Sequence, residues 1–462
     1  MRILFVSKDT DQYTNWFPQG IAYLAAVLEK EGHEVEIYTQ DIHHYPDEHL
    51  TQYLNKNHYD VVGVGSIGGY YQYRKLLKIS SAINSSRKRP FFMIGGHCPS
   101  PDPEYFLKKT KADVAILGEG EATIVEVLDT LSNKKALTNI KGIAFRDNEQ
   151  IIINEDRPLI QDIDTIPFPA YHLFPMKFYR LLRMPHIKKS DFVLPLLSGR
   201  GCTFKCTFCY RMDEGFRKRS NGAIIDEIKL LKSDYDVNYI CFSDELLMSS
   251  KERVIGLCED FIRYDLDVKW FCNGRLNYAK PDILKLMKKA GCSFINYGIE
   301  AMDNNVLKNM KKGLTTQQVI KGVEATLEVG ISPGLNILFG NVGDNMDSLN
   351  KGVDFLLKYD DGAVLRTIKP VTPYPGSPLY YTAIDNGLIK GCEDFYENKH
   401  LNSDLLTVNF TELNDDEFHR NLLDANTKLI TNYYNNQMLS SIESAKKLYL
   451  ERDSSFRGFR QR

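Results

Sequence analysis

The sequence predicts an α/β protein in which a doubly wound, Rossmann-like parallel-sheet domain is followed by a partial (β/α)6 barrel of the TIM type and a helical C-terminal region. Short and almost wholly apolar runs alternate with amphipathic segments, as expected where helices cover both faces of a parallel sheet. This alternation is interrupted between residues 136 and 190 and then restarts, which indicates two α/β domains rather than one.

The first domain is predicted to span residues 1–135. Its expected strands are 3–6, 35–38, 61–65, 91–94 and 114–117, with helices at 21–31 and 73–83 among the segments between them. Glycine-rich turns follow the third, fourth and fifth strands. They fall at the carboxyl edge of the sheet, where proteins of this architecture bind ligands.

Residues 136–190 are predicted to connect the two domains. A short hairpin is expected from strands 142–146 and 151–154, with its turn at 147–149. The segment 166–185 is rich in proline and aromatic residues. Because it carries many large apolar groups, we interpret it as an ordered strap rather than a disordered linker.

The second domain is predicted to span residues 191–378, and residues 379–462 are predicted to form the helical region, with a frayed end at 454–462. The expected barrel strands are 192–197, 239–243, 268–272, 294–298, 332–339 and 364–369. The expected helices include 224–232, 252–264, 281–289, 316–328 and 347–358. Functional residues of such barrels cluster at the carboxyl ends of the strands.

Composition restricts the classes of function. The chain has 462 residues and a net charge of −2, which gives no support to nucleic-acid binding or to binding at an anionic membrane. The basic runs 87–89, 217–219 and 308–312 are interpreted as solvated helix ends or loops. No apolar stretch approaches the length of a membrane span. Nine cysteines without paired spacing fit a reducing cytoplasm.

Three cysteines form the most specific motif. Cys202, Cys206 and Cys209 have the order C-x-x-x-C-x-x-C. Three thiolates so close in sequence can hold three corners of a cubane iron–sulfur cluster and leave the fourth iron open. A structural zinc site or an electron-carrying cluster would need a fourth ligand, but no second C-x-x-C occurs, and His186 lies beyond a predicted strand. The other six cysteines are expected to be buried small hydrophobic residues: Cys98, Cys241, Cys258, Cys272, Cys292 and Cys392.

This spacing, with an aromatic residue before the third cysteine, resembles the signature of the radical SAM enzymes. In that family the open iron is chelated by S-adenosylmethionine (SAM), and the reduced 4Fe-4S cluster cleaves SAM to a 5′-deoxyadenosyl radical. The resemblance covers about residues 191–375. It implies a flavodoxin- or ferredoxin-type reductant and a small-molecule or peptide substrate.

The resemblance also implies SAM contacts in the cysteine loop and at the strand ends: Phe208, Ser243, Asp244, Glu245, Arg275, Gly298 and Glu300. Glu300 would accept hydrogen bonds from the ribose diol, and acidic or polar groups after the second strand would accept them from the ammonium group. Two simpler explanations stay open. Asp244 and Glu245 would then cap the next helix, and Glu300 would only lie at a helix N-terminus. Ala301 stands where the family usually has serine.

The first domain resembles the cobalamin-binding domain often fused to a radical SAM barrel, through the phrases 18–28, 32–35, 60–63, 95–97 and 118–121. The resemblance implies cobalamin contacts at Gly65, Ser66, Gly95, Gly96, Gly118, Glu119 and Gly120. Many such domains carry a cobalt-ligating histidine after the first strand. Loop 7–16 has none, and His43 and His44 follow the second strand and are expected at the surface. Bound cobalt should therefore lack a protein histidine.

Together the two resemblances imply a cobalamin-dependent radical SAM enzyme. The leading hypothesis is methylation of an unactivated carbon in a biosynthetic pathway. Alternatives are a cobalamin-linked cyclisation or rearrangement, a radical SAM enzyme that has lost cobalamin, and, outside enzymes, an iron–sulfur electron-transfer module. No residue pattern indicates the substrate.

Overall fold

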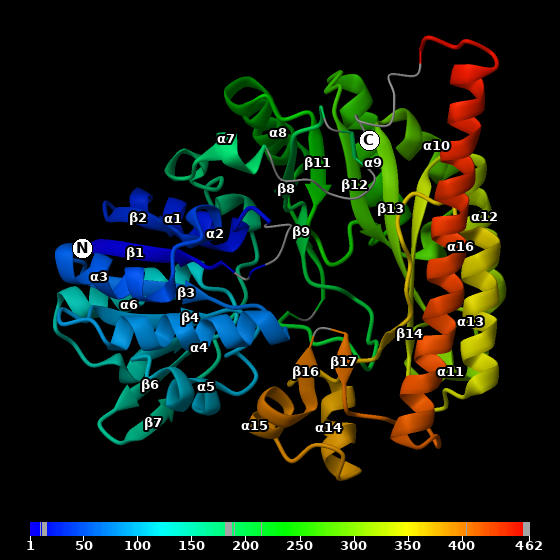
Figure 1. Ribbon diagram of the computed structural model, residues 1–462. Coiled ribbons are helices and arrows are strands. Elements are labelled where there is room, and N and C mark those ends of the chain that lie inside the picture. Colours follow the sequence, from blue (N-terminus) through cyan, green and yellow to red (C-terminus); the bar gives the residue numbers. More distant parts are fainter. Residues whose placement is uncertain are drawn as a thin grey trace.

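The computed structural model describes residues 1–9, 11, 16–180, 187–188, 190–213, 215–402 and 404–455. Figure 1 shows the N-terminal domain in blue and cyan beside a second α/β domain in green and yellow, with a long C-terminal helix in red at the far edge. The predicted fold class is confirmed. No helix within the described ranges is long and apolar enough to cross a membrane.

The first sheet has seven strands in the order β2-β1-β3-β4-β5-β6-β7. They are β1 (Arg2–Ser7), β2 (Glu34–Thr39), β3 (Val61–Gly65), β4 (Phe91–Gly95), β5 (Val114–Ile116), β6 (Ile143–Asp147) and β7 (Gln150–Ile153). The first five are parallel, whereas β6 and β7 are antiparallel. The predicted boundary at residue 135 cuts through this sheet, because the hairpin supplies its last two strands.

Helices cover both faces of the first sheet. Alternate side chains of β1 point to opposite faces, as strand geometry requires. Ile3 and Phe5 pack with α1 (Gln19–Lys30) and α6 (Glu121–Ser132). Leu4 and Val6 belong to the core on the other face, with α3 (Asp47–Lys56), α4 (Tyr70–Asn84) and α5 (Pro103–Thr110).

The described part of the strap, which reaches residue 180, is ordered, and it connects the domains through its aromatic residues. The Tyr171 hydroxyl donates to Glu227 of the second domain at 2.6 Å. The Tyr179 hydroxyl donates to Asp41 of the first domain at 2.8 Å. Both rings lie within 5.4 Å of Phe17. Residues 181–185 of the predicted strap, and His186 after them, lie outside the described residues.

The second sheet is a six-stranded, wholly parallel partial barrel in the order β15-β14-β13-β12-β11-β8. Its strands are β8 (Val193–Leu196), β11 (Tyr239–Phe242), β12 (Lys269–Gly274), β13 (Cys292–Glu300), β14 (Ser332–Phe339) and β15 (Lys369–Pro370). The principal helices between them are α8 (Asn221–Tyr235), α9 (Lys251–Arg263), α10 (Pro281–Lys289), α12 (Thr316–Glu328) and α13 (Met346–Tyr359).

The predicted strand 364–369 is wrong, because only Lys369 of it is in β15. The hydrogen bonds of this segment involve two polar side chains, Arg366 and Asn426, instead of a neighbouring strand. The buried Arg366 donates to the carbonyl of Pro333 at 2.8 Å. The amide of Ile368 donates to the side chain of Asn426 at 2.8 Å, and the Asn426 amide group donates back to the Ile368 carbonyl at 2.9 Å.

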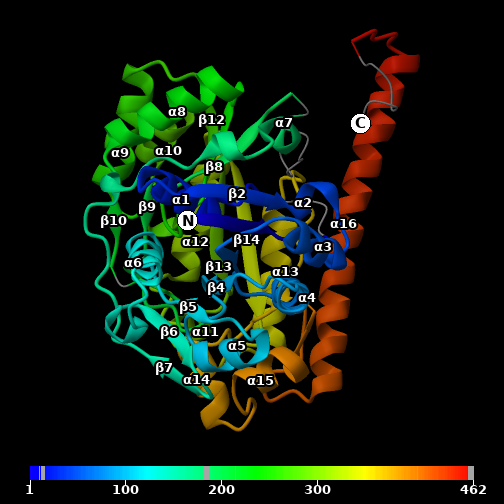
Figure 2. The same cartoon turned by 90° about the vertical axis from the view of Figure 1, so that its left-hand side faces the viewer.

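The C-terminal region covers the end of the barrel. It contains α14 (Pro378–Asp385), the hairpin β16 (His400–Asn402) and β17 (Leu405–Leu406), and α16 (Asp415–Tyr449). In Figures 1 and 2, α16 runs along α13 at the outer edge of the barrel. The Phe418 ring stacks on Phe339 at 5.2 Å. The predicted frayed end falls largely outside the described residues, from 456 onward.

The contact between Asn426 and Ile368 leads to a prediction about stability. Asn426→Ala should lower the free energy of unfolding by about 1–3 kcal/mol, because it leaves a buried amide and carbonyl without partners. The change would be measured as a lower midpoint of thermal unfolding. Asn435→Ala, on the exposed part of the same helix, is the control and should leave the midpoint nearly unchanged. Equal midpoints for the two variants would contradict the prediction.

Candidate functional site

The cysteine loop follows β8 and is attached to two distant parts of the second domain. The Thr207 amide donates to the Met310 carbonyl at 3.0 Å, beyond the end of β13. The Leu379 amide, at the start of α14, donates to the Thr207 carbonyl at 2.8 Å. These bonds hold the loop across the carboxyl end of the barrel sheet.

The three thiols lie close enough to influence one another. Burial raises the pKa of Cys209 to about 12, and the neighbouring Cys206 adds to this shift. Burial also raises the pKa of Cys202, and Cys206 contributes again. Among the described residues, no three His, Cys, Asp or Glu side chains converge on one metal ion. A donor set of three thiols alone suits a cluster in which each thiolate binds a different iron.

A buried arginine stands beside these thiols. Arg275, after β12, places Nη1 3.7 Å from Sγ of Cys206. Its guanidinium lies 3.4 Å from the centre of the Phe204 ring, and it also donates to the carbonyl of Lys312. A fixed cation favours the thiolate form of a neighbouring cysteine. The residues present therefore fit an anionic iron–sulfur cluster.

The end of β13 is distorted around Glu300. This residue has a left-handed backbone with φ of 71°, at a register shift between Gly298 and Glu300. A Cβ at position 298 would lie 2.2 Å from Oε1 of Glu300, so a larger residue there would have to displace this carboxylate. The Glu300 carboxylate accepts a hydrogen bond from Nζ of Lys312 at 2.8 Å, and both side chains are buried.

Two expectations about this region are corrected. Lys312 belongs to the run 308–312, which was expected to be solvated, yet it is only 5% exposed. The run looks like a surface segment because it also contains Lys308 and Lys311. Glu300 does not lie at a helix N-terminus, since α11 (Asn304–Asn309) is capped by Asp303. Phe208 packs against Ala301 and its neighbours, and Nζ of Lys312 lies 5.7 Å from its ring centre.

Ser243, Asp244 and Glu245, the three predicted SAM contacts after β11, lie in different surroundings. Asp244 is 1% exposed, and its carboxylate accepts hydrogen bonds from the amide and the hydroxyl of Ser198. Burial raises the pKa of Asp244 to about 6. Ser243 donates to the side chain of Gln19 in α1 at 2.7 Å, across the domain boundary. The helix-capping alternative for Asp244 and Glu245 is wrong, because Ser250 caps α9.

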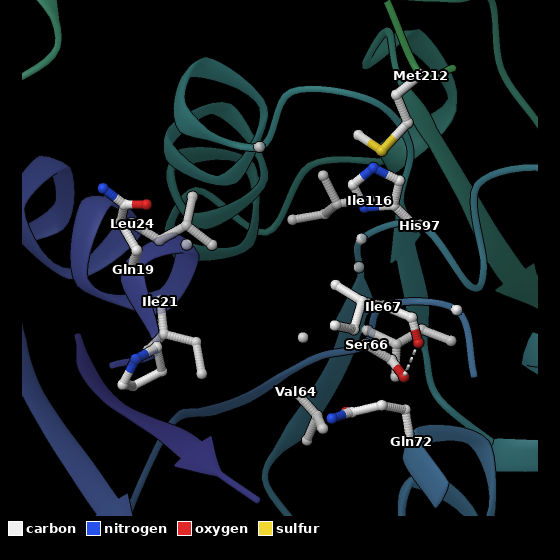
Figure 3. A pocket seen from close by; sticks show the side chains of 18 of the residues that line it. Gln19, Ile21, Leu24, Val64, Ser66, Ile67, Gln72, His97, Ile116 and Met212 are labelled. Carbon is white, nitrogen blue, oxygen red and sulfur yellow. Dashed lines mark hydrogen bonds between the residues drawn. The ribbon is translucent and has the colours of Figure 1, made fainter. Parts of the chain in front are cut away.

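A cavity of about 840 Å³ lies between the carboxyl edges of the two sheets. This volume is in the upper part of the range of protein ligand cavities, about 300–1,000 Å³. Its lining includes all seven residues of the predicted cobalamin set and two of the SAM set: Gly65, Ser66, Gly95, Gly96, Gly118, Glu119, Gly120, Ser243 and Glu245. The cysteines, Phe208, Asp244, Arg275, Gly298 and Glu300 are outside this lining. In Figure 3 the side chains of Ile21 and Leu24 in α1 stand on one side of the cavity and Ile67 on the other.

Glu119 of the cavity wall is also the centre of an interdomain ion-pair cluster. It accepts from Arg200 at 2.6 Å, from Arg217 at 2.9 Å and from the Ile160 amide at 2.7 Å. Arg200 also bonds Glu121 at 2.6 Å. Burial raises the pKa of Glu119, but the bonds from Arg200, Ile160 and Arg217 outweigh it, so that the pKa lies below its usual value.

Sequence reasoning missed this cluster. Its signal was the run 217–219, which was expected to be solvated, whereas the side chains of Arg217 and Arg219 are buried. Arg217 and Arg200 are cross-strand partners in the short ladder of β9 (Gly199–Arg200) and β10 (Arg217–Lys218). Only this pairing, which no sequence spacing reveals, brings the two guanidinium groups to one carboxylate.

The histidines near the cavity are arranged as follows. Residues 10 and 12–15 of the loop after β1 lie outside the described residues, so its lack of histidine rests on the sequence. His43 and His44 are exposed, as predicted. His97 lines the cavity beside Met212, and its ring centre is 6.0 Å from that of Tyr210. Burial lowers the pKa of His97, which favours a neutral ring.

Comparison with protein families matches each domain separately. The profile of the radical SAM superfamily matches residues 196–356. The profile of the B12 binding domain matches residues 11–128.

Similar proteins align with most of this chain. An uncharacterized methyltransferase, PH0819 of Pyrococcus horikoshii, is 29% identical over 400 residues, which are 84% of each chain. The anaerobic magnesium-protoporphyrin IX monomethyl ester cyclase of Cereibacter sphaeroides is 26% identical over 82% of this chain and 63% of the relative. The cytidylyl-2-hydroxyethylphosphonate methyltransferase of Streptomyces wedmorensis is 24% identical over 82% and 80%.

Solved structures have the same fold. The radical S-adenosylmethionine methyltransferase TsrM from Kitasatospora setae, with cobalamin and a [4Fe-4S] cluster bound, gives a TM-score of 0.69 at 18% identity, over 83% of this chain and 78% of that chain. The cobalamin-dependent radical enzyme OxsB with aqua-cobalamin gives 0.65 at 19% identity, over 86% and 56%. The two domain matches follow the two sheets in chain order, and the three-thiol loop lies in the second. The chain therefore contains a B12-binding domain followed by a radical SAM domain.

Proposed function

We propose that this protein is a cobalamin-dependent radical SAM methyltransferase that methylates an unactivated carbon of a small molecule or peptide in a biosynthetic pathway. The observation that carries the proposal is the position of the cavity, between the glycine turns of the B12-binding domain and the strand ends of the barrel. Groups bound in the two domains would face each other across it. Of the three relatives compared by sequence, two are called methyltransferases, which supports methylation.

Bound together, a 4Fe-4S cluster, SAM and cobalamin would supply one-electron cleavage of SAM and a transferable methyl group. The protein's own residues have the task of placement. Cys202, Cys206 and Cys209 would hold the cluster, and Arg275 would offset negative charge on its sulfur ligands. Glu300 would accept from the ribose diol of SAM while Lys312 fixes its carboxylate in one orientation.

The remaining strand-end residues have different parts in this arrangement. Ser243 and Glu245 face the cavity and would accept hydrogen bonds from the ammonium group of SAM. Asp244 would act through Ser198, whose amide and hydroxyl it holds at the end of β8. The apolar side chains of α1 and of the loop after β3 would keep water from the reacting groups.

A second candidate function, cyclisation, is supported by one of the relatives. The similarity to an ester cyclase favours a cobalamin-linked cyclisation as the alternative to methylation. A form without cobalamin would leave the glycine-lined half of the cavity without an evident ligand. A pure electron carrier would need a fourth cluster ligand, which the spacing of cysteine and histidine in the sequence does not supply. We expect a flavodoxin- or ferredoxin-type reductant and a cytoplasmic location.

Reconstitution tests the proposed function directly. Protein loaded anaerobically with iron, sulfide and hydroxocobalamin should show the visible spectrum of a bound corrinoid. With SAM, a reductant and candidate metabolites, the product mass should rise by one methylene unit. A product with no added carbon would favour cyclisation, and failure to bind any corrinoid would remove the methyl-transfer mechanism.

The cysteine loop gives a second prediction. Cys206→Ala should abolish reductive SAM cleavage, because two thiolates no longer hold a cluster of about four irons with one open site. Iron content and 5′-deoxyadenosine formation measure the effect. Cys258→Ala, in the buried core at α9, is the matched control and should retain both. Undiminished SAM cleavage by the Cys206 variant would end the radical SAM mechanism.

The buried ion pair gives a third prediction. Lys312→Met should destabilise the protein by about 3–5 kcal/mol, because Glu300 is then buried without its cation. It should also weaken SAM binding, measured by calorimetry. The double variant Lys312→Met/Glu300→Gln should regain most of the thermal stability but not the SAM affinity. Normal SAM affinity in the double variant would contradict the ribose role of Glu300.

A further inference from the structure

Lys8 occupies a distinctive position in the first domain. It directly follows β1, next to β3 in the sheet. The chain leaves β1 for α1 on one face and β3 for α4 on the other. Open α/β sheets bind ligands at such a point, where successive connections diverge. Lys8 lines the cavity there together with Gly65 and Ser66.

In the part of the chain that the structure describes, the ammonium group of Lys8 has no hydrogen-bonding partner. Its Nζ is buried and forms no hydrogen bond with any described residue. The groups that act on its charge are the Cys98 thiol and a second cation, Lys75. Lys75 is itself paired with Asp47 at 2.7 Å. Burial lowers the pKa of Lys8 to about 8, so the group still carries its charge in most molecules at neutral pH.

The other basic residue of the cavity lining is different. Arg200 is bound to both Glu119 and Glu121. An isolated buried cation is unfavourable unless a ligand supplies the counter-charge. Among the described residues that line the cavity, Lys8 is thus an uncompensated positive charge at the ligand-binding edge of the B12-binding domain.

We propose that Lys8 binds the phosphodiester of the nucleotide tail of cobalamin. This inference rests on the cobalamin site of the proposed function. The phosphodiester is the anionic group of the cofactor's periphery, since the side chains of the corrin ring are neutral amides and methyl groups. A charged hydrogen bond in a buried site discriminates strongly between ligands that carry the phosphate and ligands that lack it.

Three corrinoids distinguish the phosphate from the rest of the cofactor: cobinamide, which has no nucleotide tail, cobinamide phosphate, and hydroxocobalamin. Each would be titrated into the intact protein carrying its reconstituted cluster, and binding would be followed by visible absorbance. Lys8→Met should weaken hydroxocobalamin and cobinamide phosphate by roughly 10- to 100-fold, the range for hydrogen bonds to charged groups. Cobinamide binding should stay within about twofold, and Lys8→Arg should restore part of the lost affinity.

Controls separate this role from a structural one. Lys108→Met removes an exposed lysine of the same domain and should change no affinity. Lys8→Met should raise the thermal midpoint of the corrinoid-free protein, because it removes a buried unpaired charge. If a folded Lys8 variant loses affinity for all three corrinoids equally, or for none of them, the proposed role of Lys8 is overturned, but the cofactor assignment is not. An unchanged protein that binds no corrinoid would overturn the cofactor assignment as well.

A phosphorylated substrate is the other possible source of a phosphate group at Lys8. Inorganic phosphate and pyrophosphate would be added to corrinoid-loaded protein, and the thermal midpoint would be measured for the unchanged chain and for Lys8→Met. If the tail occupies Lys8, neither anion should stabilise the unchanged chain through this residue. The opposite result has two parts: an added anion stabilises the cobalamin-loaded unchanged chain but not Lys8→Met, and Lys8→Met leaves the corrinoid affinities unaffected. This result would assign the lysine to a phosphorylated substrate and overturn the proposal.

Discussion

The arrangement of the whole site depends on one buried carboxylate, Glu119, held by two arginines of the other domain. Arg200 and Arg217 face each other across the β9–β10 ladder. Like charges in such positions repel, so the ladder is favourable only with an anion between them. The B12-binding domain supplies that anion from the turn after β5. The same contact that neutralises the ladder therefore aligns the carboxyl edges of the two sheets.

The radical SAM half of the site depends on a second buried pair, at the distorted end of β13. Glu300 and Lys312 neutralise each other where neither is solvated. The left-handed backbone of Glu300 turns its carboxylate back toward the strand, and Gly298 leaves space for it. Local strain of this kind persists only where surrounding contacts support it. Here Lys312, with its carbonyl bound to Arg275, links the end of β13 to the cysteine loop.

Most of the fold could be predicted from the sequence, because buried parallel strands are apolar on both faces and therefore stand out. The predicted strands at Val61–Gly65 and Ser332–Phe339 have the observed limits. The last barrel strand was predicted too long, since Asn426, some 58 positions away, takes its backbone bonds. The three closely spaced cysteines and the glycine turns carry strong local signals. Arg217 and Lys312 carry misleading ones, because a basic run gives no sign that one of its members is buried against a distant acid.

The bond between Asn426 and Ile368 has a consequence beyond stability. A barrel of six strands that does not close leaves an open border, and unpaired backbone at such a border invites strand addition by another molecule. Here the carboxamide of a helix imitates the neighbouring strand and satisfies both polar groups of Ile368. The C-terminal helix thereby prevents a strand of another molecule from pairing with this edge of the sheet. A shortened chain that ends before α16 would leave this border bare and prone to aggregation.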